Sequence, residues 1–216
     1  MAYNKEYYKW QAPIGEFGGW ANLSKFRKYT TGDQDVLDFG CGGGFLLKQL
    51  DCKTRTGIEV NPAAREAARQ NGSVVYEKTE DVPDNSFDLI ISNHALEHVH
   101  HPLGELKLLY QKLRVGGRSV FVVPCETIYC SYREDDINHH LYTWSPMCLG
   151  NLFKEAGFLV VESKPFMHKW RMKFRFFARF GGRWLFELAS RLYGRIDRRM
   201  FQVRVVAEKG TNPGKT

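Results

Sequence analysis

The sequence lacks the usual marks of a secreted, membrane-spanning or disulfide-bonded protein. Its five cysteines are odd in number, widely spread and without a CxxC pair, so neither a zinc ribbon nor a disulfide framework is indicated. No apolar run approaches the ~18 residues of a membrane span. Residues 1–6 also lack the apolar core of a signal peptide. We therefore expect reduced thiols and a cytoplasmic location.

Two nucleotide-binding patterns are also missing. The GK[ST] ending of a P-loop is absent, and the dinucleotide fingerprint G-x-G-x-x-G, begun at Gly40, would need glycine where the chain has Phe45. With 216 residues, 43% of them hydrophobic and 25% charged, the chain suits one globular domain. That length leaves little room for the substrate domain of a dehydrogenase.

The positive charge is confined to one late segment. Residues 166–200 hold ten Lys or Arg side chains against two acidic ones, a net charge of +8, whereas the other 181 residues sum to −1. Aromatic residues recur at helical spacing in this segment, Arg171, Arg175, Arg179 and Arg183 follow every fourth position, and Gly181-Gly182 is expected to divide it into two helices. The segment is thus a basic amphipathic helical insertion.

The rest of the chain alternates strands with helices, which predicts a parallel sheet covered by helices on both faces. Expected strands cover residues 36–39, 55–60, 73–77, 87–92, 119–123, 158–162 and 201–207, and expected helices 45–50, 61–70, 103–113 and 145–156. We divide the chain into an aromatic arm or lid at 1–34, the main domain at 35–208 and a disordered tail at 209–216. Because Pro13 and nearby glycines interrupt long helices, the arm is expected to hold one short helix near 19–30.

A glycine-rich turn directly follows the first expected strand. It reads Gly40-Cys41-Gly42-Gly43-Gly44, and Glu59 ends the next strand. Glycines let the backbone turn tightly and approach a ligand, and a carboxylate at the end of the second strand can accept both hydroxyls of a ribose. Together they indicate a nucleoside ligand.

These blocks resemble class I S-adenosylmethionine-dependent methyltransferases, in the small-molecule subgroup called type 11 or type 12. Beside the glycine-rich turn, the matching motifs are Gly57–Asn61, the block 84–99 around the fourth strand, the turn 113–118 and the junction 152–158. The resemblance implies a Rossmann-like α/β fold with a seven-stranded mixed sheet of order 3-2-1-4-5-7-6, the seventh strand antiparallel. The basic insertion would then lie between strands six and seven.

The resemblance also assigns a set of cofactor-binding residues. Asp38 would organise the glycine turn, Glu59 would hold the ribose, and Asn93 and His94 would line the methionine side. An acidic residue that the family often places near adenine is replaced by Lys78, so adenine contacts are expected from Thr79 or Glu80. The full set is Asp38, Gly40, Cys41, Gly42, Glu59, Val60, Thr79, Glu80, Asn93 and His94.

Methyl transfer from a sulfonium is a direct displacement, so the protein mainly aligns the reactants and excludes water. A hydroxyl acceptor also needs a base, and histidine suits this role near neutral pH. His140 is the best candidate, with His98 and His139 as further candidates. The alternative for His140 is packing or capping of the helix that follows. The histidine-rich run after Glu97 hints at a metal, but we expect none because the resembling sequences carry Glu-His-Val there without one.

The acceptor is left open between several classes. The basic segment 166–200 could cap the acceptor pocket, contact an anionic membrane or a lipid-linked acceptor, or bind RNA or another polyanion. We expect a small-molecule or lipid- or sugar-linked acceptor, methylated at oxygen, with the protein in the cytoplasm or peripheral to the inner face of the membrane. The alternatives are an RNA methyltransferase and a non-catalytic partner subunit that binds the cofactor. The oligomeric state is not predicted.

Overall fold

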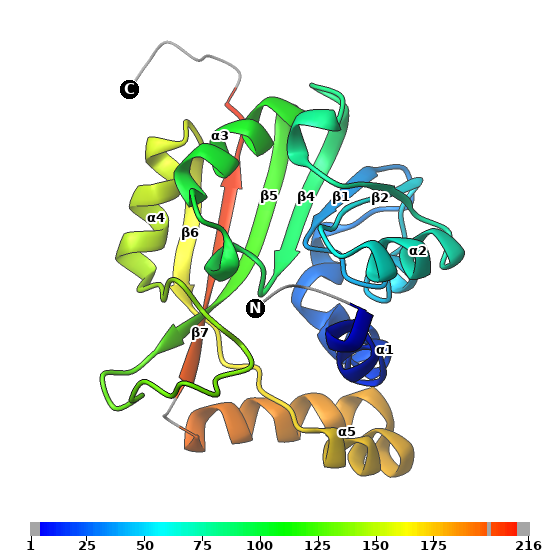
Figure 1. Cartoon of the computed structure of the whole chain (residues 1–216), viewed down its shortest axis with the longest axis vertical. Coiled ribbons are helices and arrows are strands. Elements are labelled where there is room, and N and C mark those ends of the chain that lie inside the picture. Colours follow the sequence, from blue (N-terminus) through cyan, green and yellow to red (C-terminus); the bar gives the residue numbers. More distant parts are fainter. Residues whose placement is uncertain (1–4, 198–199, 211–216) are drawn as a thin grey trace.

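The computed structural model describes residues 5–197 and 200–210 and forms a single seven-stranded sheet of order β3-β2-β1-β4-β5-β7-β6 (Figure 1). The predicted order is confirmed, as is the antiparallel direction of β7 against both β5 and β6. The strands are β1 Asp35–Phe39, β2 Thr54–Ile58, β3 Val74–Tyr76, β4 Phe87–Asn93, β5 Leu113–Glu126, β6 Leu159–Pro165 and β7 Met200–Glu208.

Helices cover both faces of the sheet. The described α-helices are α1 Lys5–Phe26, α2 Pro62–Gln70, α3 Pro102–Lys112, α4 Pro146–Glu155 and α5 Arg175–Ile196. Apolar residues of α3 and α4 pack into one core cluster with Leu37, whereas the neighbouring Val36 joins a second cluster with residues of α1 and α2. Both faces of β1 are therefore buried, as is typical of a central parallel strand.

Two helix starts follow the rule for capping residues before proline. The Asn61 side chain accepts hydrogen bonds from the backbone N–H groups of Ala63 and Ala64, and Pro62 begins α2. Ser145 accepts one from Cys148 before Pro146 begins α4. Both side chains satisfy donors that have no partner inside the first helical turn, as predicted.

The long helix α1 overturns the expectation of a short helix near 19–30. It runs without a break from Lys5 through Pro13 to Phe26. Pro13 is exposed and removes one backbone hydrogen bond, a cost that tertiary packing of the following turns outweighs. The side chains of residues 5–11, Tyr7, Tyr8 and Trp10 among them, lie outside the described part.

Strand β5 also departs from prediction. Gly116-Gly117 was expected to stop the preceding helix, but α3 already ends at Lys112 and β5 runs through the glycines, with Gly116 at a φ of +79°. Pro124 does not end the strand either. It pairs with Gln202 of β7 at a point where β4 has ended, and proline is tolerated there as in an edge strand. The helix expected over 45–50 is only a 3-10 turn, Leu47–Gln49.

Both faces of β7 are buried. Gln202 and Arg204 are 8% and 7% exposed, and Val203 and Val205, which alternate with them, are 1% and 0% exposed. β7 lies between β5 and β6 and is covered on both sides, so both sets of side chains are buried. Arg204 keeps its charge paired with Glu162 of β6, at 2.7 Å between Nη2 and Oε1.

The basic insertion lies between β6 and β7, as predicted, and Gly182 interrupts the helical backbone of α5 with a φ of +61°. Figure 1 shows α5 beside α1 at the lower end of the sheet, toward which β4 points and from which β7 returns. The aromatic residues that recur at helical spacing in this segment do not all face the core. Phe174 and Phe186 are buried, whereas Trp184 is 74% exposed.

None of the described helices is both long and apolar enough to cross a bilayer. At the end of the chain, Lys209 donates hydrogen bonds from Nζ to the carbonyl of Leu113 and to Oδ1 of Asn85, so the boundary expected after residue 208 falls inside an ordered contact. Residues 211–216 of the predicted tail lie outside the described residues.

Candidate functional site

A cavity of about 230 Å³ lies between the glycine-rich turn after β1, the end of β4 and α1. Helix α1 lies at the end of the sheet toward which β4 points (Figure 1). The cavity wall combines the glycine-rich turn after β1, the end of β4, the inner side of α1 and Trp170 of the insertion. The lining residues are Ala12, Ile14, Gly15, Gly18, Gly19, Asn22, Asp38, Gly40, Cys41, Gly42, Gly43, Phe45, Leu46, Asn93, His94 and Trp170. Six predicted cofactor residues therefore share one wall, namely Asp38, Gly40, Cys41, Gly42, Asn93 and His94.

The glycine-rich turn needs its glycines for two reasons. Gly40 and Gly42 have φ angles of +75° and +52°, in the left-handed region that side chains disfavour. A Cβ on Gly40 would collide with the Ala95 side chain, whereas around a Cβ on Gly42 there is open space. The turn thus packs tightly on the protein side and leaves its backbone open toward the cavity. The backbone N–H groups of Gly40 and Cys41 both donate to the carbonyl of Ile58, which fixes the turn against β2.

Glu59 lies directly after β2 and holds this turn from the other side. Its carboxylate accepts from the backbone N–H of Gly42 at 2.9 Å and of Asn61 at 2.8 Å. Burial raises the pKa of Glu59 despite these two donors. Glu59 is outside the cavity wall but adjoins it at Gly42, the place expected for a ribose.

Asp38 is almost fully buried at the end of β1 and lines the cavity. Burial raises its pKa well above the ordinary value, and the nearby negative charge of Glu59 raises it further. Two carboxyl groups thus flank the glycine turn in a poorly solvated place. A cationic ligand in the cavity would favour their ionised forms.

Three other predicted cofactor residues lie away from this cavity. Thr79 is buried, and its hydroxyl donates to the Glu105 carboxylate of α3. Glu80 and Val60 are exposed. Val60 follows β2 and Glu80 follows β3. The side of the site on which adenine was expected is therefore an exposed surface.

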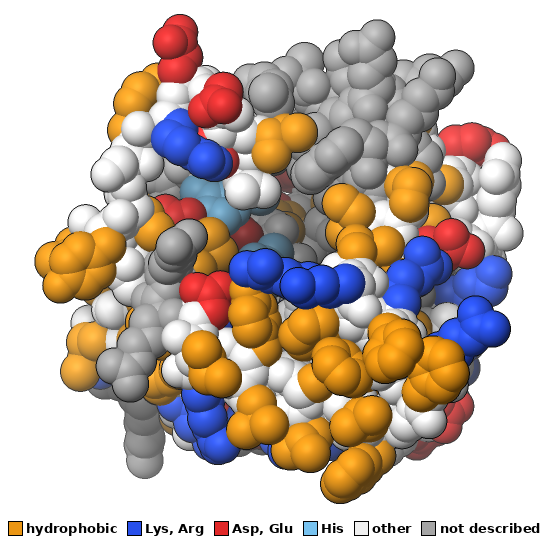
Figure 2. Space-filling model, turned by 90° about the horizontal axis from the view of Figure 1, so that it is seen from below, with side chains coloured by type: hydrophobic (Ala, Val, Ile, Leu, Met, Phe, Trp, Pro, Cys, Tyr) orange, Lys and Arg blue, Asp and Glu red, His pale blue; other side chains and the backbone are white. Residues whose placement is uncertain are grey.

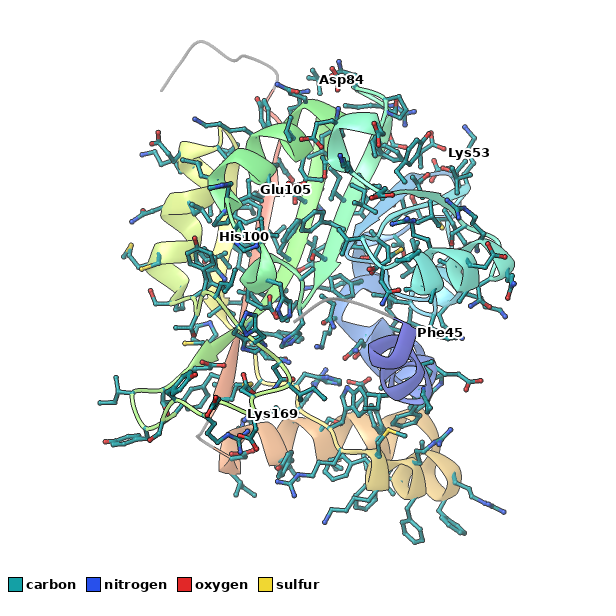
Figure 3. All side chains as sticks on the ribbon, viewed as in Figure 1. Phe45, Lys53, Asp84, His100, Glu105 and Lys169 are labelled. Atoms are coloured by element: carbon teal, nitrogen blue, oxygen red, sulfur yellow. The ribbon has the colours of Figure 1, made fainter. Side chains whose placement is uncertain are left out.

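Helix α1 and the insertion together cover the cavity. Gly19 packs against the backbone of Phe45 so closely that a Cβ would collide with it, and Phe45 lies beside α1 in Figure 3. Trp170 donates from its indole nitrogen to Asn22 at 3.0 Å, and its ring packs edge-on against Phe17 with centroids 5.3 Å apart. Contacts between Trp170 and α1 thus join the two segments where they cover the cavity.

A buried lysine that sequence reasoning missed reaches the end of β4. Lys25 is 1% exposed and donates from Nζ to Oδ1 of Asn93 at 2.8 Å. Burial lowers the pKa of Lys25 to about 7, opposed by the negative charges of Glu187 and Glu97. Asn93 is therefore held in place on the cavity wall. In the sequence, Lys25 was only a lysine inside the short helix expected near residues 19–30, which does not reveal burial.

His94 connects the cavity wall to a cluster of histidines around one buried carboxylate. The amide of Gln202 donates to His94 Nε2 at 2.8 Å, so the other ring nitrogen, Nδ1, carries hydrogen and faces Glu97 Oε1 at 3.3 Å. Burial lowers the pKa of His94, although the nearby Glu97 carboxylate opposes this shift. Burial acts to raise the pKa of Glu97, but the His94 donor keeps it below its ordinary value.

His98 and His140 complete this cluster. The Nε2 atoms of both rings lie 4.0 Å from Glu97 Oε1, and the ring centroids are 5.1 Å apart. His140 Nδ1 contacts Glu126 Oε1 at 2.6 Å. His139 was predicted as a third candidate, but its ring is exposed and only its carbonyl reaches the cluster, at 3.4 Å from His98 Nδ1. Glu97 and Glu126 were missed as members.

Figure 2 looks onto this end of the molecule and shows histidine side chains inside a hollow near its centre. Acidic side chains lie around the hollow, and hydrophobic side chains form a broad band below it with Lys and Arg among them.

A family model described as a methyltransferase domain matches residues 5–163 of the chain. Among curated proteins, the ribosomal protein L11 methyltransferase of Burkholderia mallei is 37% identical over 94 residues, which make up 39% of this chain and 30% of that protein. The chain thus matches less than a third of the length of such relatives.

Solved structures give the same fold at low identity. A possible histamine N-methyltransferase from Thermotoga maritima superposes with a TM-score of 0.65 at 19% identity, over 94% of each chain. A phosphoethanolamine N-methyltransferase from Haemonchus contortus, in complex with phosphomonomethylethanolamine and S-adenosylhomocysteine, gives a TM-score of 0.65 at 16% identity, over 88% of this chain and 52% of that one.

Proposed function

This chain belongs to the family of methyltransferase domains, and we propose that it transfers a methyl group from S-adenosylmethionine to a hydroxyl of a small or lipid-linked molecule. The cofactor fits the residues present. The glycine turn leaves backbone and space open at Gly42, and Glu59 offers a carboxylate beside it. When bound, the cofactor supplies a methyl group activated on a cationic sulfur.

The observation that carries the proposal is the position of His94. It lines the cavity beside the glycine turn and also faces Glu97 in the histidine cluster. A methionine portion along Gly40 and Gly42 would therefore end close to Asn93 and His94. The cluster of Glu97, His98 and His140 lies on the far side of His94, where an acceptor would stand.

The residues have three tasks in this reaction. The glycine turn and Asn93 orient the methyl donor, and α1 with Trp170 excludes water from it. The acceptor oxygen forms a bond to the methyl carbon as the carbon–sulfur bond breaks, and the hydroxyl proton leaves toward the histidine cluster. Glu126 holds His140 at Nδ1 and so directs Nε2 into the cluster.

The role of His140 is tested by replacing it with alanine. Since a positioned base contributes about 100-fold or more, His140→Ala slows turnover roughly 100-fold, while the affinity for S-adenosylhomocysteine stays within about twofold. Turnover is followed by labelled methyl transfer to a panel of hydroxyl-bearing sugars and lipid-linked sugars, and affinity by calorimetry. His100→Ala, on an exposed ring nearby, is the control. Unchanged turnover in His140→Ala contradicts the assignment, and transfer to RNA alone favours the alternative acceptor class.

We also propose that α5 rests on an anionic membrane surface. Six large apolar side chains, at every fourth position of the helix, are between 41% and 78% exposed, namely Phe176, Phe180, Trp184, Leu188, Leu192 and Ile196. Exposed arginines flank them, and the segment 166–200 carries a net charge of +8. Apolar side chains flanked by cations suit the boundary between headgroups and acyl chains. A membrane on this side would deliver a lipid-linked acceptor to the hollow of Figure 2.

Membrane contact is tested by sedimentation with phosphatidylcholine vesicles, with and without phosphatidylglycerol. We expect binding to need the anionic lipid and to fall about tenfold in Trp184→Glu, because a charge replaces an interfacial ring. Met147→Glu is the matched control, since Met147 of α4 is 73% exposed and Trp184 is 74% exposed. Binding that ignores lipid charge, or an equal loss in both variants, contradicts the proposal.

A further inference from the structure

We propose that Glu97, His98 and His140 bind one divalent transition-metal ion. One carboxylate oxygen and two ring nitrogens of these residues all lie within 4.8 Å of one another. Two imidazoles and one carboxylate form a common ligand set for ions such as Zn²⁺ or Co²⁺, and catalytic sites of this kind keep a further position open.

The buried carboxylate is the first observation that points to a cation. Glu97 is fully buried, and neither of its carboxylate oxygens has a hydrogen-bond partner of good geometry among the described residues. An unpaired buried carboxylate is costly. His94 Nδ1 lies 3.3 Å from Glu97 Oε1, at a distance typical of a weak contact. An ion between Glu97, His98 and His140 would place a positive charge directly beside the buried carboxylate.

The orientation of the two rings is a second, independent observation. His140 is held at Nδ1 by Glu126, and His98 Nδ1 lies 3.4 Å from the carbonyl of His139. Each ring therefore has an acceptor at one nitrogen and turns the other, Nε2, toward Glu97. Metal-binding histidines are oriented in this way by a carboxylate or carbonyl on the far nitrogen.

An ion would draw the three side chains together. Both Nε2 atoms lie 4.0 Å from Glu97 Oε1, and the three candidate ligand atoms lie within 4.8 Å of one another. Donors about 2.1 Å from one tetrahedral ion are about 3.4 Å apart, so the side chains would have to rotate until the ligand atoms move closer by about 1 Å. The side chains of His98 and His140 are 20% and 11% exposed, so an ion and an acceptor can enter from their side.

The sequence alone led to the opposite expectation, because the resembling sequences carry Glu-His-Val at this point without a metal. His140 lies 43 positions after Glu97, and the fold brings the two together. His100 and His101 are exposed and outside the cluster.

The ion would deepen the proposed function. Its role in turnover rests on that function, whereas its binding does not. An acceptor hydroxyl on the open position would lose its proton more easily, as metal-bound water does. His140 would then be a ligand rather than the base itself. His140→Ala slows turnover whether His140 is the base or a metal ligand, so metal binding has to be measured separately.

The test titrates the chelator-treated whole protein with Co²⁺ and with Zn²⁺, following Co²⁺ absorption and the heat of binding. We expect one ion per chain and at least a tenfold loss of affinity in His98→Ala and in His140→Ala. Glu126→Gln should lose about tenfold through the orientation of His140. His100→Ala, from the same histidine-rich run, should bind as the wild type does.

Two outcomes overturn the inference. One is no stoichiometric binding, and the other is equal binding in His98→Ala and the wild type, which would mark an adventitious ion only. Titration with S-adenosylhomocysteine separates this failure from failure of the proposed function. A protein that binds the nucleoside but no metal keeps the methyltransferase proposal and loses the metal. A protein that binds the metal but transfers no methyl group keeps the metal site and loses the methyltransferase proposal.

Discussion

Glu59 illustrates how one side chain can serve both the fold and the ligand. Its two oxygens accept from Gly42 and Asn61, which fixes the glycine turn against the start of α2. The same carboxylate stands where the ribose of the cofactor is expected. Its sequence position correctly predicted that it follows the second strand, and the contact with a ribose stays a prediction.

The prediction at this scale is that Glu59→Gln weakens binding of S-adenosylhomocysteine. A glutamine amide of the same size cannot accept two hydroxyls and two backbone donors at once. Hydrogen bonds to a charged group contribute about 1.5–3 kcal/mol, so the affinity should fall roughly 10- to 100-fold by calorimetry. Glu66→Gln, on the exposed side of α2, is the control. Equal affinities for the two variants would show that Glu59 does not touch the ligand.

At the scale of elements, α1 is positioned by its small residues. Gly15 and Gly19 face Phe45, and Gly18 faces Trp170, so the helix approaches the glycine turn and the insertion at close range. Glycine usually weakens a helix interior. Here it permits the contact that closes the cavity, which explains why a segment rich in glycine is still a helix.

We therefore expect Gly19→Ala to destabilise the protein and to weaken nucleoside binding. The added methyl group meets the carbonyl of Phe45, a backbone group that cannot rotate away. Overpacking of this kind costs about 1–3 kcal/mol, measurable by urea unfolding. Gly104→Ala in α3 has its nearest neighbour at 3.9 Å and should be neutral or stabilising, since alanine favours the helix. A Gly19→Ala protein as stable as the Gly104→Ala protein would refute the close contact.

At the scale of the whole molecule, Lys25 ties three parts of the chain together. It reaches from the end of α1 to Asn93 of β4. Glu187 of α5, one of the charges that act on Lys25, lies 3.1 Å from His168 Nε2, and that ring is also buried. Arm, sheet and insertion thus meet in one buried polar network, so disturbing it should affect the stability of the whole fold.

This network predicts a pH dependence of stability. Because the pKa of Lys25 is about 7 in the folded state and 10.5 ordinarily, the unfolded chain binds the extra proton between these values. The free energy of unfolding should therefore rise with pH across this window, by roughly 1 kcal/mol per unit from this group. Lys25→Met removes that rise, whereas Lys53→Met, at a lysine 64% exposed, keeps it. Urea unfolding at pH 7, 8 and 9 measures the slopes, and equal slopes in the two variants would contradict a depressed pKa.

The amino-acid sequence alone was enough to predict the order of the sheet and the part of the site that lies next to β1 and β2. Glycines, strand-end acids and capping residues act through local backbone geometry, so Gly40, Gly42, Glu59, Asn61 and Ser145 could be read from their neighbours.

Features that depend on contacts between distant segments became visible only in the folded structure. It buried Lys25 and Arg204, kept α1 helical through Pro13 and turned Trp184 outward, because burial depends on which surface packs against each face. It also brought His140 to Glu97, and Glu126 to His140. This cluster combines the turn after β4, the end of β5 and the loop before α4. Such a cluster has no periodicity along the chain, so its chemistry became visible only when the fold placed these segments side by side.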